Sequence, residues 1–333
     1  MMRLPKFEYV VPATIDEALS LLNQYGQEAC LLAGGTDLLV AAKLRNVTPR
    51  LLISMGGIQD LKGVTYEEGK GMKIGALTPL YHIRNDPMVL KYYSGLAQAA
   101  ASVGAPQLQR MGTIGGNVCL NTRCFFYNQS SSWRRHRQVC FKMGGDICHV
   151  VPKGKKCFAL FSADTSPVLM ALEAKLKLIS SKGERVLPIK EFYTGDGKKP
   201  TTINPGEILS EIQLPPPPAG QSSIYLKYRI RSSIDFPLAG VAVSIVKDEK
   251  SEDCRRAEVV LTALGSAPII VNVANNLLKG ASISKEVIRE ASDMAVRAAH
   301  PVANADSTPT YRRKMAGILT GNALEELSKA FRI

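Results

Sequence analysis

The spacing of apolar and polar positions divides the first part of the chain into short helical and extended segments. Thr14-Ile-Asp-Glu17 has the form of a capping box, and apolar residues follow it at helical spacing as far as Gly26. This pattern predicts a helix that starts after Thr14 and ends at Gly26. The next segment, ACLLAGGTDLLVAAK (29–43), predicts a strand, a glycine turn and a helix, and LLISM (51–55) predicts the strand that completes this unit.

The middle of the chain shows further strands and one helix. We expect a helix in LKYYSGLAQAAASVG (90–104) and a glycine-rich turn in MGTIGGNVCLN (111–121). Strand patterns occur in MKIGALT (72–78), in PVLMALEAKLKLIS (167–180) and in ILSEIQL (208–214). The run from Pro215 to Gly220 holds four prolines and a glycine, which is typical of a linker.

The segment after this linker predicts a second α+β unit. Three strand patterns, IYLKYRI, LAGVAVSIV and RAEVVLTALG, precede two helical patterns around 284–299 and 309–331, the second opened by Pro309. We therefore predict an α+β chain with a first domain over 1–215 and a C-terminal domain over 221–333. The first domain is expected to contain two subdomains, 1–57 and 58–215.

Length and composition limit the class of protein. A chain of 333 residues with 45% hydrophobic residues is typical of a globular protein of two or three domains. The sequence has no run of 18 apolar residues, so we expect no membrane contact, and its N-terminus has no apolar stretch of the signal-peptide type. These features predict a cytoplasmic protein. In that compartment, seven cysteines indicate thiols or metal ligands rather than disulfides.

The positive charge is concentrated in one segment. Residues 121–159 hold eight Lys or Arg against the single Asp146, and so supply seven of the thirteen net positive charges. A basic segment with several cysteines is compatible with a zinc-stapled module that binds nucleic acid, and this alternative stays open. Few aromatic residues accompany the basic ones, which counts against it, so we expect no nucleic-acid partner.

Two glycine turns follow predicted strands, in LLAGGTDLL (31–39) and TIGGN (113–117). Backbone N–H groups in such turns can approach a phosphate closely, and a following helix adds positive potential. A plain turn is an alternative for each. Together they favour one ligand with two phosphates, such as a dinucleotide. Neither turn matches G-x-G-x-x-G or the P-loop pattern.

Four cysteines of the basic segment, Cys124, Cys140, Cys148 and Cys157, are spaced C-x15-C-x7-C-x8-C. Thiolates are ligands for zinc and for iron–sulfur clusters, and the spacing alone leaves zinc, a cluster and unliganded thiols open. Cys119 lies close enough in sequence to compete as a ligand, but we expect it to lie in the core on a buried strand. No arrangement of the catalytic-triad or carboxylate-pair type is evident, so we predict no catalytic residue.

Five segments carry a resemblance to a known family: LLAGGTDLL, GALTPL, ASVGAPQLQRMGTIGGNV, SADTSPVLMALEA and YLKYRIRSSIDFPLAGVAV. In this order they resemble the FAD-binding medium subunit of molybdenum hydroxylases of the xanthine oxidase family. The resemblance implies a two-subdomain FAD-binding domain, with the pyrophosphate across 32–38 and 113–117. Asp164 would reach the flavin nucleotide, and Lys227 would approach the isoalloxazine edge. The implied cofactor-binding residues are Leu32, Ala33, Gly34, Gly35, Thr36, Asp37, Leu38, Thr78, Thr113, Gly115, Gly116, Asn117, Asp164 and Lys227.

The segment between Asn117 and Asp164 is short in most members of that family and spans 47 positions here. Its four-cysteine insertion, over 122–160, resembles that of the 4-hydroxybenzoyl-CoA reductase branch. This resemblance implies a [4Fe–4S] cluster held by Cys124, Cys140, Cys148 and Cys157. A net negative cluster needs nearby cations. The candidates are Arg134, Arg135, Arg137, Lys142, Lys153, Lys155 and Lys156.

The implied function is electron transfer within a larger assembly. Electrons would pass between an external donor such as ferredoxin, the cluster and FAD, towards a [2Fe–2S] small subunit and a molybdopterin-binding large subunit. The implied overall reaction is reductive dehydroxylation of 4-hydroxybenzoyl-CoA to benzoyl-CoA. The alternative within the family is the FAD subunit of a molybdenum hydroxylase that acts on a purine or an aromatic substrate.

Overall fold

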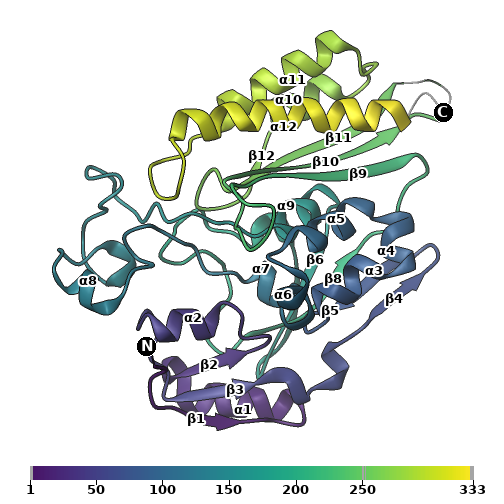
Figure 1. Cartoon of the computed structure of the whole chain (residues 1–333). Helices are drawn as coiled ribbons and strands as arrows, with labels where there is room; N and C mark the ends of the chain where they lie inside the picture. Colours follow the sequence, from purple (N-terminus) through teal and green to yellow (C-terminus); the bar gives the residue numbers. More distant parts are fainter. Residues whose placement is uncertain (1–2, 250, 252, 331–333) are drawn as a thin grey trace.

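A computed structural model describes residues 3–249, 251 and 253–330, which form three sheets with helices between and around them (Figure 1). The sheets follow one another along the chain and along the long axis of the molecule. The three-stranded sheet lies at one end, the five-stranded sheet in the middle, and the four-stranded sheet beneath the C-terminal helices. None of the described helices is long and apolar enough to cross a membrane.

The three-stranded sheet is parallel and contains the predicted strand–helix–strand unit. The unit consists of β2 (Ala29–Leu32), α2 (Leu38–Lys43) and β3 (Leu51–Ser54). The sequence patterns did not predict β1 (Glu8–Val10), which pairs with β3 on its other side. Its three residues are all exposed, so β1 lacks the alternation that marks a half-buried strand.

The first helix, α1 (Ile15–Tyr25), confirms the predicted start and end. The hydroxyl of Thr14 accepts a hydrogen bond from the N–H of Glu17 at 3.2 Å. The Glu17 carboxylate accepts in return from the N–H of Ala13, at 2.7 Å. This reciprocal pair satisfies two N–H groups at the helix start.

The middle sheet is antiparallel, with the order β4-β5-β8-β6-β7. Its strands are β4 (Val64–Glu67), β5 (Gly71–Gly75), β6 (Lys175–Ser180), β7 (Gly183–Pro188) and β8 (Ile208–Leu214). The strands predicted in 72–78 and 208–214 are confirmed. The large gap in sequence between β5 and β8, which pair directly, holds the helical layer and the insertion.

The helices of this middle part are α3 (Leu80–Asn85), α4 (Pro87–Tyr92), α5 (Ser94–Ser102), α6 (Pro106–Met111), α7 (Ile114–Val118) and α9 (Thr165–Ala171). Two of them, α3 and α6, were not predicted, and the chain differs from the prediction in three further segments.

The single helix predicted over 90–104 is wrong, because the chain breaks at Tyr93, whose hydroxyl donates to the carbonyl of Pro215 at 2.7 Å. The predicted turn at 111–121 contains the helix α7. The alternation in 174–178 is confirmed by β6, whereas the first part of 167–180 forms α9. Every residue of α9 is buried, so its apolar pattern has no polar face to reveal the helical period.

The C-terminal sheet is buried on both faces. It consists of β9 (Gln221–Tyr228), β10 (Ala239–Lys247), β11 (Cys254–Thr262) and β12 (Ile269–Ile270). On one face lie α10 (Asn272–Leu278), α11 (Lys285–Ala298) and α12 (Pro309–Ala330), and on the other lie α5 and α9 (Figure 1). The last two helices were predicted, whereas α10 was missed.

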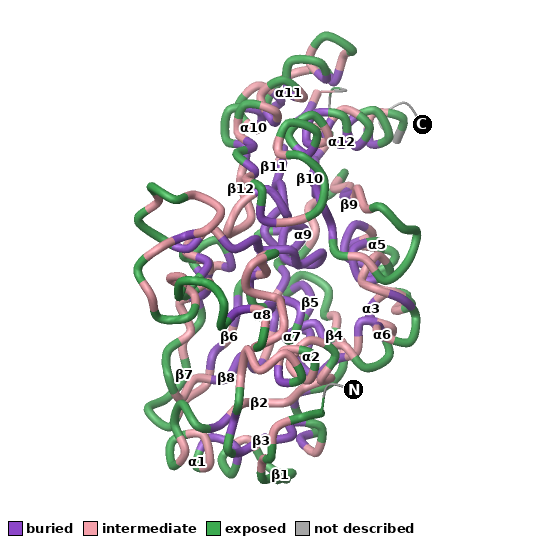
Figure 2. The backbone as a smooth tube through the Cα atoms, turned by 60° about the vertical axis from the view of Figure 1, so that its left-hand side comes forward, coloured by how far each residue is buried: buried purple, intermediate pink, exposed green. Residues whose placement is uncertain are grey.

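Alternation along β10 explains how the C-terminal sheet joins the rest of the molecule. Val241 and Val243 pack with the C-terminal helices, whereas Ala242 packs in the same core as the middle sheet and α5. Figure 2 shows this continuous buried centre around α9, β10 and β11. The middle and C-terminal sheets therefore share one core across the linker, whereas the three-stranded sheet packs in a separate cluster. The predicted boundaries at 57 and 215 fall in the connections between sheets.

The insertion over 122–160 leaves the core and returns to it at one point. Arg123 and Leu160 exchange backbone hydrogen bonds of 2.8 and 2.6 Å, which close the base of the insertion. Beyond this base the segment contains the short helix α8 (Ser131–Arg135), a 3₁₀ turn (Phe141–Met143) and otherwise irregular backbone, and it projects at the side of the molecule (Figure 1).

Candidate functional site

The two glycine turns predicted from the sequence lie against each other. A side-chain carbon at Gly34 would lie 1.8 Å from the backbone oxygen of Met111 and 3.0 Å from Gly112. Such contacts are possible only without a side chain. The loop between β2 and α2, which holds residues 32–38, therefore packs directly on the backbone that leads into α7. Two separate motifs form one surface.

In the first turn, the backbone of Gly35 and the carboxylate of Asp37 lie just before α2. Gly35 adopts φ +72°, a left-handed conformation that favours glycine. Asp37 precedes α2 but makes no side-chain cap to it. Its carboxylate instead pairs with Arg123 of the insertion at 3.0 Å. Burial raises the pKa of Asp37, and the charges of Arg123 and Lys142 oppose this rise.

The second turn is held by its own side chains. The hydroxyl of Thr113 accepts from the N–H of Gly116 at 3.1 Å. The amide oxygen of Asn117 accepts from both the N–H and the hydroxyl of Thr165, at 3.1 and 2.7 Å. Gly115 is packed against Ala76, whereas Gly116 is exposed. Thr113 and Asn117 thus fix the shape of a turn whose exposed backbone is open to a ligand.

Thr78 lies behind this turn. Its hydroxyl accepts from the N–H of Gly63 at 2.9 Å and donates to the Gly63 carbonyl at 3.0 Å. Its own carbonyl accepts from the N–H of Ile114 at 3.0 Å. The side chain is buried and stabilises the start of α7.

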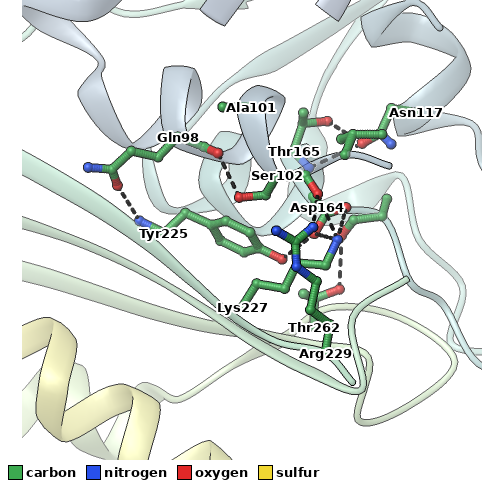
Figure 3. A network of polar contacts seen from close by, with 12 residues as sticks. Gln98, Ala101, Ser102, Asn117, Asp164, Thr165, Tyr225, Lys227, Arg229 and Thr262 are labelled. Atoms are coloured by element: carbon green, nitrogen blue, oxygen red, sulfur yellow. Dashed lines mark hydrogen bonds and ion pairs between the residues drawn. The ribbon is translucent and has the colours of Figure 1, made fainter. Parts of the chain in front are cut away.

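Asp164 and Lys227 meet in a buried ion pair (Figure 3). The ammonium group of Lys227 lies 3.1 Å from the Asp164 carboxylate, and the two side chains are 4% and 3% exposed. The hydroxyl of Tyr225 donates to the same carboxylate at 2.7 Å, and Lys227 also donates to the carbonyl of Ser102 at 2.8 Å. Burial raises the pKa of Asp164, and the Lys227 charge opposes the rise. The Asp164 carboxylate and the Lys227 ammonium therefore contact each other.

A cavity of about 550 Å³ adjoins this region. It is bordered by the base of the insertion, by the β9–β10 loop and by residues 304–306, and Arg123 links it to Asp37 of the first turn. The buried hydroxyl of Ser162, two positions before Asp164, lines the cavity and has no hydrogen-bond partner among the described residues. An unpartnered buried hydroxyl is the kind of group that a polar ligand satisfies.

These features fit a flavin dinucleotide. The two glycine turns pack against each other, and glycine lets a phosphate approach the backbone of each turn closely. The neighbouring cavity has the volume of a typical cofactor pocket.

The four cysteines of the insertion surround one small cavity. Cys124, Cys140, Cys148 and Cys157 all line it, although up to 33 positions separate them in the sequence. Backbone N–H groups point at the sulfurs, those of Phe126 and Tyr127 at Cys124 and that of Ala159 at Cys157. In the part of the chain that the structure describes, no three His, Cys, Asp or Glu side chains converge closely enough to hold one metal ion.

The basic residues of the insertion divide into two groups. Five are exposed: Arg135, Arg137, Lys153, Lys155 and Lys156. Arg134 is buried, and its guanidinium donates to the carbonyls of Leu44 and Arg45 at 3.2 and 2.9 Å. Lys142 lies beside the cysteines. Burial lowers the pKa of Lys142 to about 8, and the neighbouring sulfurs of Cys157 and Cys124 oppose this shift.

The structure corrects the placement of Cys119. The sequence predicted a core residue on a buried strand, but Cys119 is exposed at the end of the helix α7. It follows the glycine turn directly, and the turn closes into a helix instead of continuing as a strand. Cys119 is not among the residues that line the cysteine cavity.

Comparison with known proteins identifies the family. The profile described as the FAD binding domain in molybdopterin dehydrogenase matches residues 5–217, and that of the CO dehydrogenase flavoprotein C-terminal domain matches residues 224–327. The chain belongs to this family of FAD-binding subunits. The predicted fold class is confirmed, and so is the coarser functional prediction, the FAD subunit of a molybdenum hydroxylase.

Individual relatives cover nearly the whole chain. The carbon monoxide dehydrogenase medium chain of Afipia carboxidovorans is 28% identical over 96% of both chains. The FAD-binding subunit of an Escherichia coli aldehyde oxidoreductase is 33% identical over 66% of this chain and 71% of its own. A structure of carbon monoxide dehydrogenase from Hydrogenophaga pseudoflava has a TM-score of 0.81 with 28% identity and covers 99% of both chains.

Sequence reasoning missed the residues that complete these sites from a distance. Gly197, in the loop before β8, lies against Cys157: a side-chain carbon there would be 2.9 Å from its sulfur. Tyr225 and Ser102 complete the partners of the Asp164–Lys227 pair. Asp196-Gly197 is a turn signal in the sequence, but nothing in the pattern indicates what the turn contacts.

Proposed function

We propose that this FAD-binding subunit is an electron-transfer subunit that carries a [4Fe–4S] cluster in its insertion. The observation that supports the cluster most strongly is the gathering of four distant cysteines around one cavity. The base of the same insertion is paired to the first glycine turn through Arg123 and Asp37. Two redox groups are thus proposed on one continuous part of the chain.

The glycine turns are the proposed site of the FAD pyrophosphate. Backbone N–H groups around Gly34 and Gly35 are the proposed donors to the pyrophosphate. The exposed Gly116 would let it approach the second turn, whose N–H groups at Gly115 and Gly116 donate within the protein. Asp164 and Lys227 are proposed to border the flavin from their buried pair. Bound FAD would supply an electron carrier that accepts or donates one or two electrons.

The proposal of a cluster rather than zinc concerns the four cysteine sulfurs. Four thiolates on one zinc ion each lie about 2.3 Å from it, so they converge on a point. The four cysteines line one small cavity, and no three of the described His, Cys, Asp or Glu side chains converge on a single point, so the choice of a cluster over zinc rests on the resemblance of the insertion. Backbone N–H groups aimed at Cys124 and Cys157 are the hydrogen bonds that stabilise cluster sulfurs.

The proposed partners rest on the family of the chain. We propose a molybdopterin-binding large subunit and a [2Fe–2S] small subunit as partners, because the chain itself matches only the flavin-binding part of a molybdopterin dehydrogenase. The five exposed cations of the insertion favour an acidic electron donor of the ferredoxin type.

Two overall reactions are candidates. Reductive dehydroxylation of 4-hydroxybenzoyl-CoA rests on the resemblance of the insertion. Relatives named as carbon monoxide, nicotinate and xanthine dehydrogenase subunits support a hydroxylase-type complex at least as well. An assay of the complete complex on both classes of substrate distinguishes them, since the substrate is expected to bind on another chain.

Replacing one cysteine tests the cluster. We expect Cys148→Ser to lose most of the iron while keeping FAD, because it removes a ligand from the insertion and leaves both glycine turns intact. The measurement is iron and FAD content per chain in the anaerobically purified protein. Cys119→Ser is the matched control, because Cys119 lies outside the cavity, and it should keep both groups.

Other outcomes would contradict the proposal. Wild-type protein with FAD and one zinc but no iron would leave a flavoprotein with a structural metal site. If Cys148→Ser retains iron and Cys119→Ser loses it, Cys119 and not Cys148 is a ligand, and the proposed set of four cysteines is wrong. Loss of FAD together with iron in Cys148→Ser would make the insertion part of the flavin site.

A further inference from the structure

Lys142 occupies a distinct position among the cations of the insertion. Its side chain borders the cavity that the four cysteines line. The exposed cations of the insertion do not line this cavity. They are Arg135, Arg137, Lys153, Lys155 and Lys156. Sequence patterns did not distinguish these residues, but in the structure Lys142 lies beside the sulfurs.

Three oxygen atoms hold the Lys142 ammonium group in place. It donates to the side-chain oxygen of Asn121 at 2.8 Å, to the hydroxyl of Thr122 at 2.6 Å and to the carbonyl of Gly197 at 2.6 Å. All three acceptors are uncharged. The ammonium group thus has its hydrogen bonds satisfied without a direct carboxylate partner. Asp37 and Asp196 interact with it electrostatically without a hydrogen bond, and the sulfurs of Cys157 and Cys124 have the larger effect on it.

The loop at 194–198 fixes this geometry from outside the insertion. The N–H of Gly197 donates to the carbonyl of Cys157 at 2.9 Å, while its carbonyl accepts from Lys142 and from the hydroxyl of Thr122. A side chain at Gly197 would lie 2.7 Å from the N–H nitrogen of Ala159. This loop therefore closes tightly over Cys157 and Lys142 together.

We propose that Lys142 is a positioning residue whose charge stabilises the reduced cluster and raises its reduction potential. This inference rests on the proposed function. Each added electron makes a four-thiolate cluster more negative, and a fixed cation nearby lowers the free energy of the reduced state more than that of the oxidised state. Lys142 would thereby set how readily the cluster accepts an electron from its donor.

The test is a redox titration of the cluster in the intact protein, in which the electron paramagnetic resonance signal of the reduced cluster is the readout. Lys142→Met should shift the midpoint potential to a more negative value, and Lys142→Arg should restore most of it. Lys156→Met is the matched control, because Lys156 donates to the carbonyl of Gly195 in the same loop at 2.9 Å but is exposed. It should leave the potential unchanged.

Each result decides the inference. An unchanged potential in Lys142→Met overturns it. If Lys142→Met assembles no cluster while Lys142→Arg does, the positive charge is required at this position and the inference stands. If neither variant assembles a cluster, the role of Lys142 is packing, and the inference fails. Wild-type protein without iron would instead overturn the proposed function itself.

Discussion

Single residues set the shape of the glycine-turn surface, and Gly34 shows this most clearly. The loop before α2 can approach the chain before α7 only because position 34 carries no side chain, since an added carbon would lie 1.8 Å from the Met111 oxygen. That contact is what brings two separate sequence motifs together. Binding of the pyrophosphate that is proposed to lie across both turns depends on the distance between the turns.

We expect Gly34→Ala to lower the affinity for FAD by more than tenfold, because the added methyl group must force the two turns apart. Titration of the apoprotein with FAD, followed by flavin fluorescence, measures this. Gly56→Ala is the control, because the nearest atom to an added carbon there lies 3.9 Å away. Equal affinity of the Gly34→Ala variant and the wild type would contradict the proposed site.

The residue scale also shows where sequence reasoning stops. The glycine turns and the four cysteines could be predicted, because local conformation and residue chemistry mark them. The pairing of Asp164 with Lys227 could not be predicted, because 63 positions separate the two residues and neither motif indicates which residue its side chain contacts. The same holds for Lys142, which the sequence could not distinguish from its exposed neighbours.

At the scale of elements, the insertion holds α2 at both ends. Arg123 pairs with Asp37 before the helix, and Arg134 donates to the carbonyls of Leu44 and Arg45 after it. The residue Arg45 adopts φ +58°, a conformation that non-glycine residues rarely adopt. The insertion therefore stabilises the helix that follows the first glycine turn, and this coupling joins the two proposed cofactor sites.

We expect Arg134→Met to loosen this coupling, because it leaves the carbonyls at the end of α2 without their charged donor. Hydrogen bonds to charged groups contribute about 1.5–3 kcal/mol each. Faster hydrogen exchange in residues 38–46 and 127–135 should result. Arg135→Met, on the same helix but exposed, should exchange at the wild-type rate. Unchanged exchange in Arg134→Met would show that the insertion is attached elsewhere.

Secondary structure was predictable where one face of an element is polar. The strands β6 and β8 of the middle sheet alternate over part of their length, and the capping box marks α1, whereas β10 is buried on both faces and was predicted from its run of β-branched residues. Prediction failed for α9, which is buried on every side, and for β1, which is exposed throughout. In both cases the periodic contrast between apolar and polar positions is missing.

At the scale of the whole molecule, the base of the insertion contacts all three parts of the chain. Arg123 reaches the N-terminal sheet region through Asp37, and Thr122 donates to the carbonyl of Gly197 in the middle part. The side chain of Asn304, from the C-terminal part, donates to the carbonyl of Phe158 at 2.7 Å. The proposed cluster site is thus fixed relative to the proposed flavin site by contacts that no single sheet provides.

The most direct test of this account is the cofactor content of the purified wild-type chain. Iron, acid-labile sulfide and FAD are measured together, with the visible spectrum before and after dithionite. The account predicts one FAD with about four irons and four sulfides per chain and a broad absorbance that bleaches on reduction. One FAD with a single zinc ion, or with no metal at all, would contradict it.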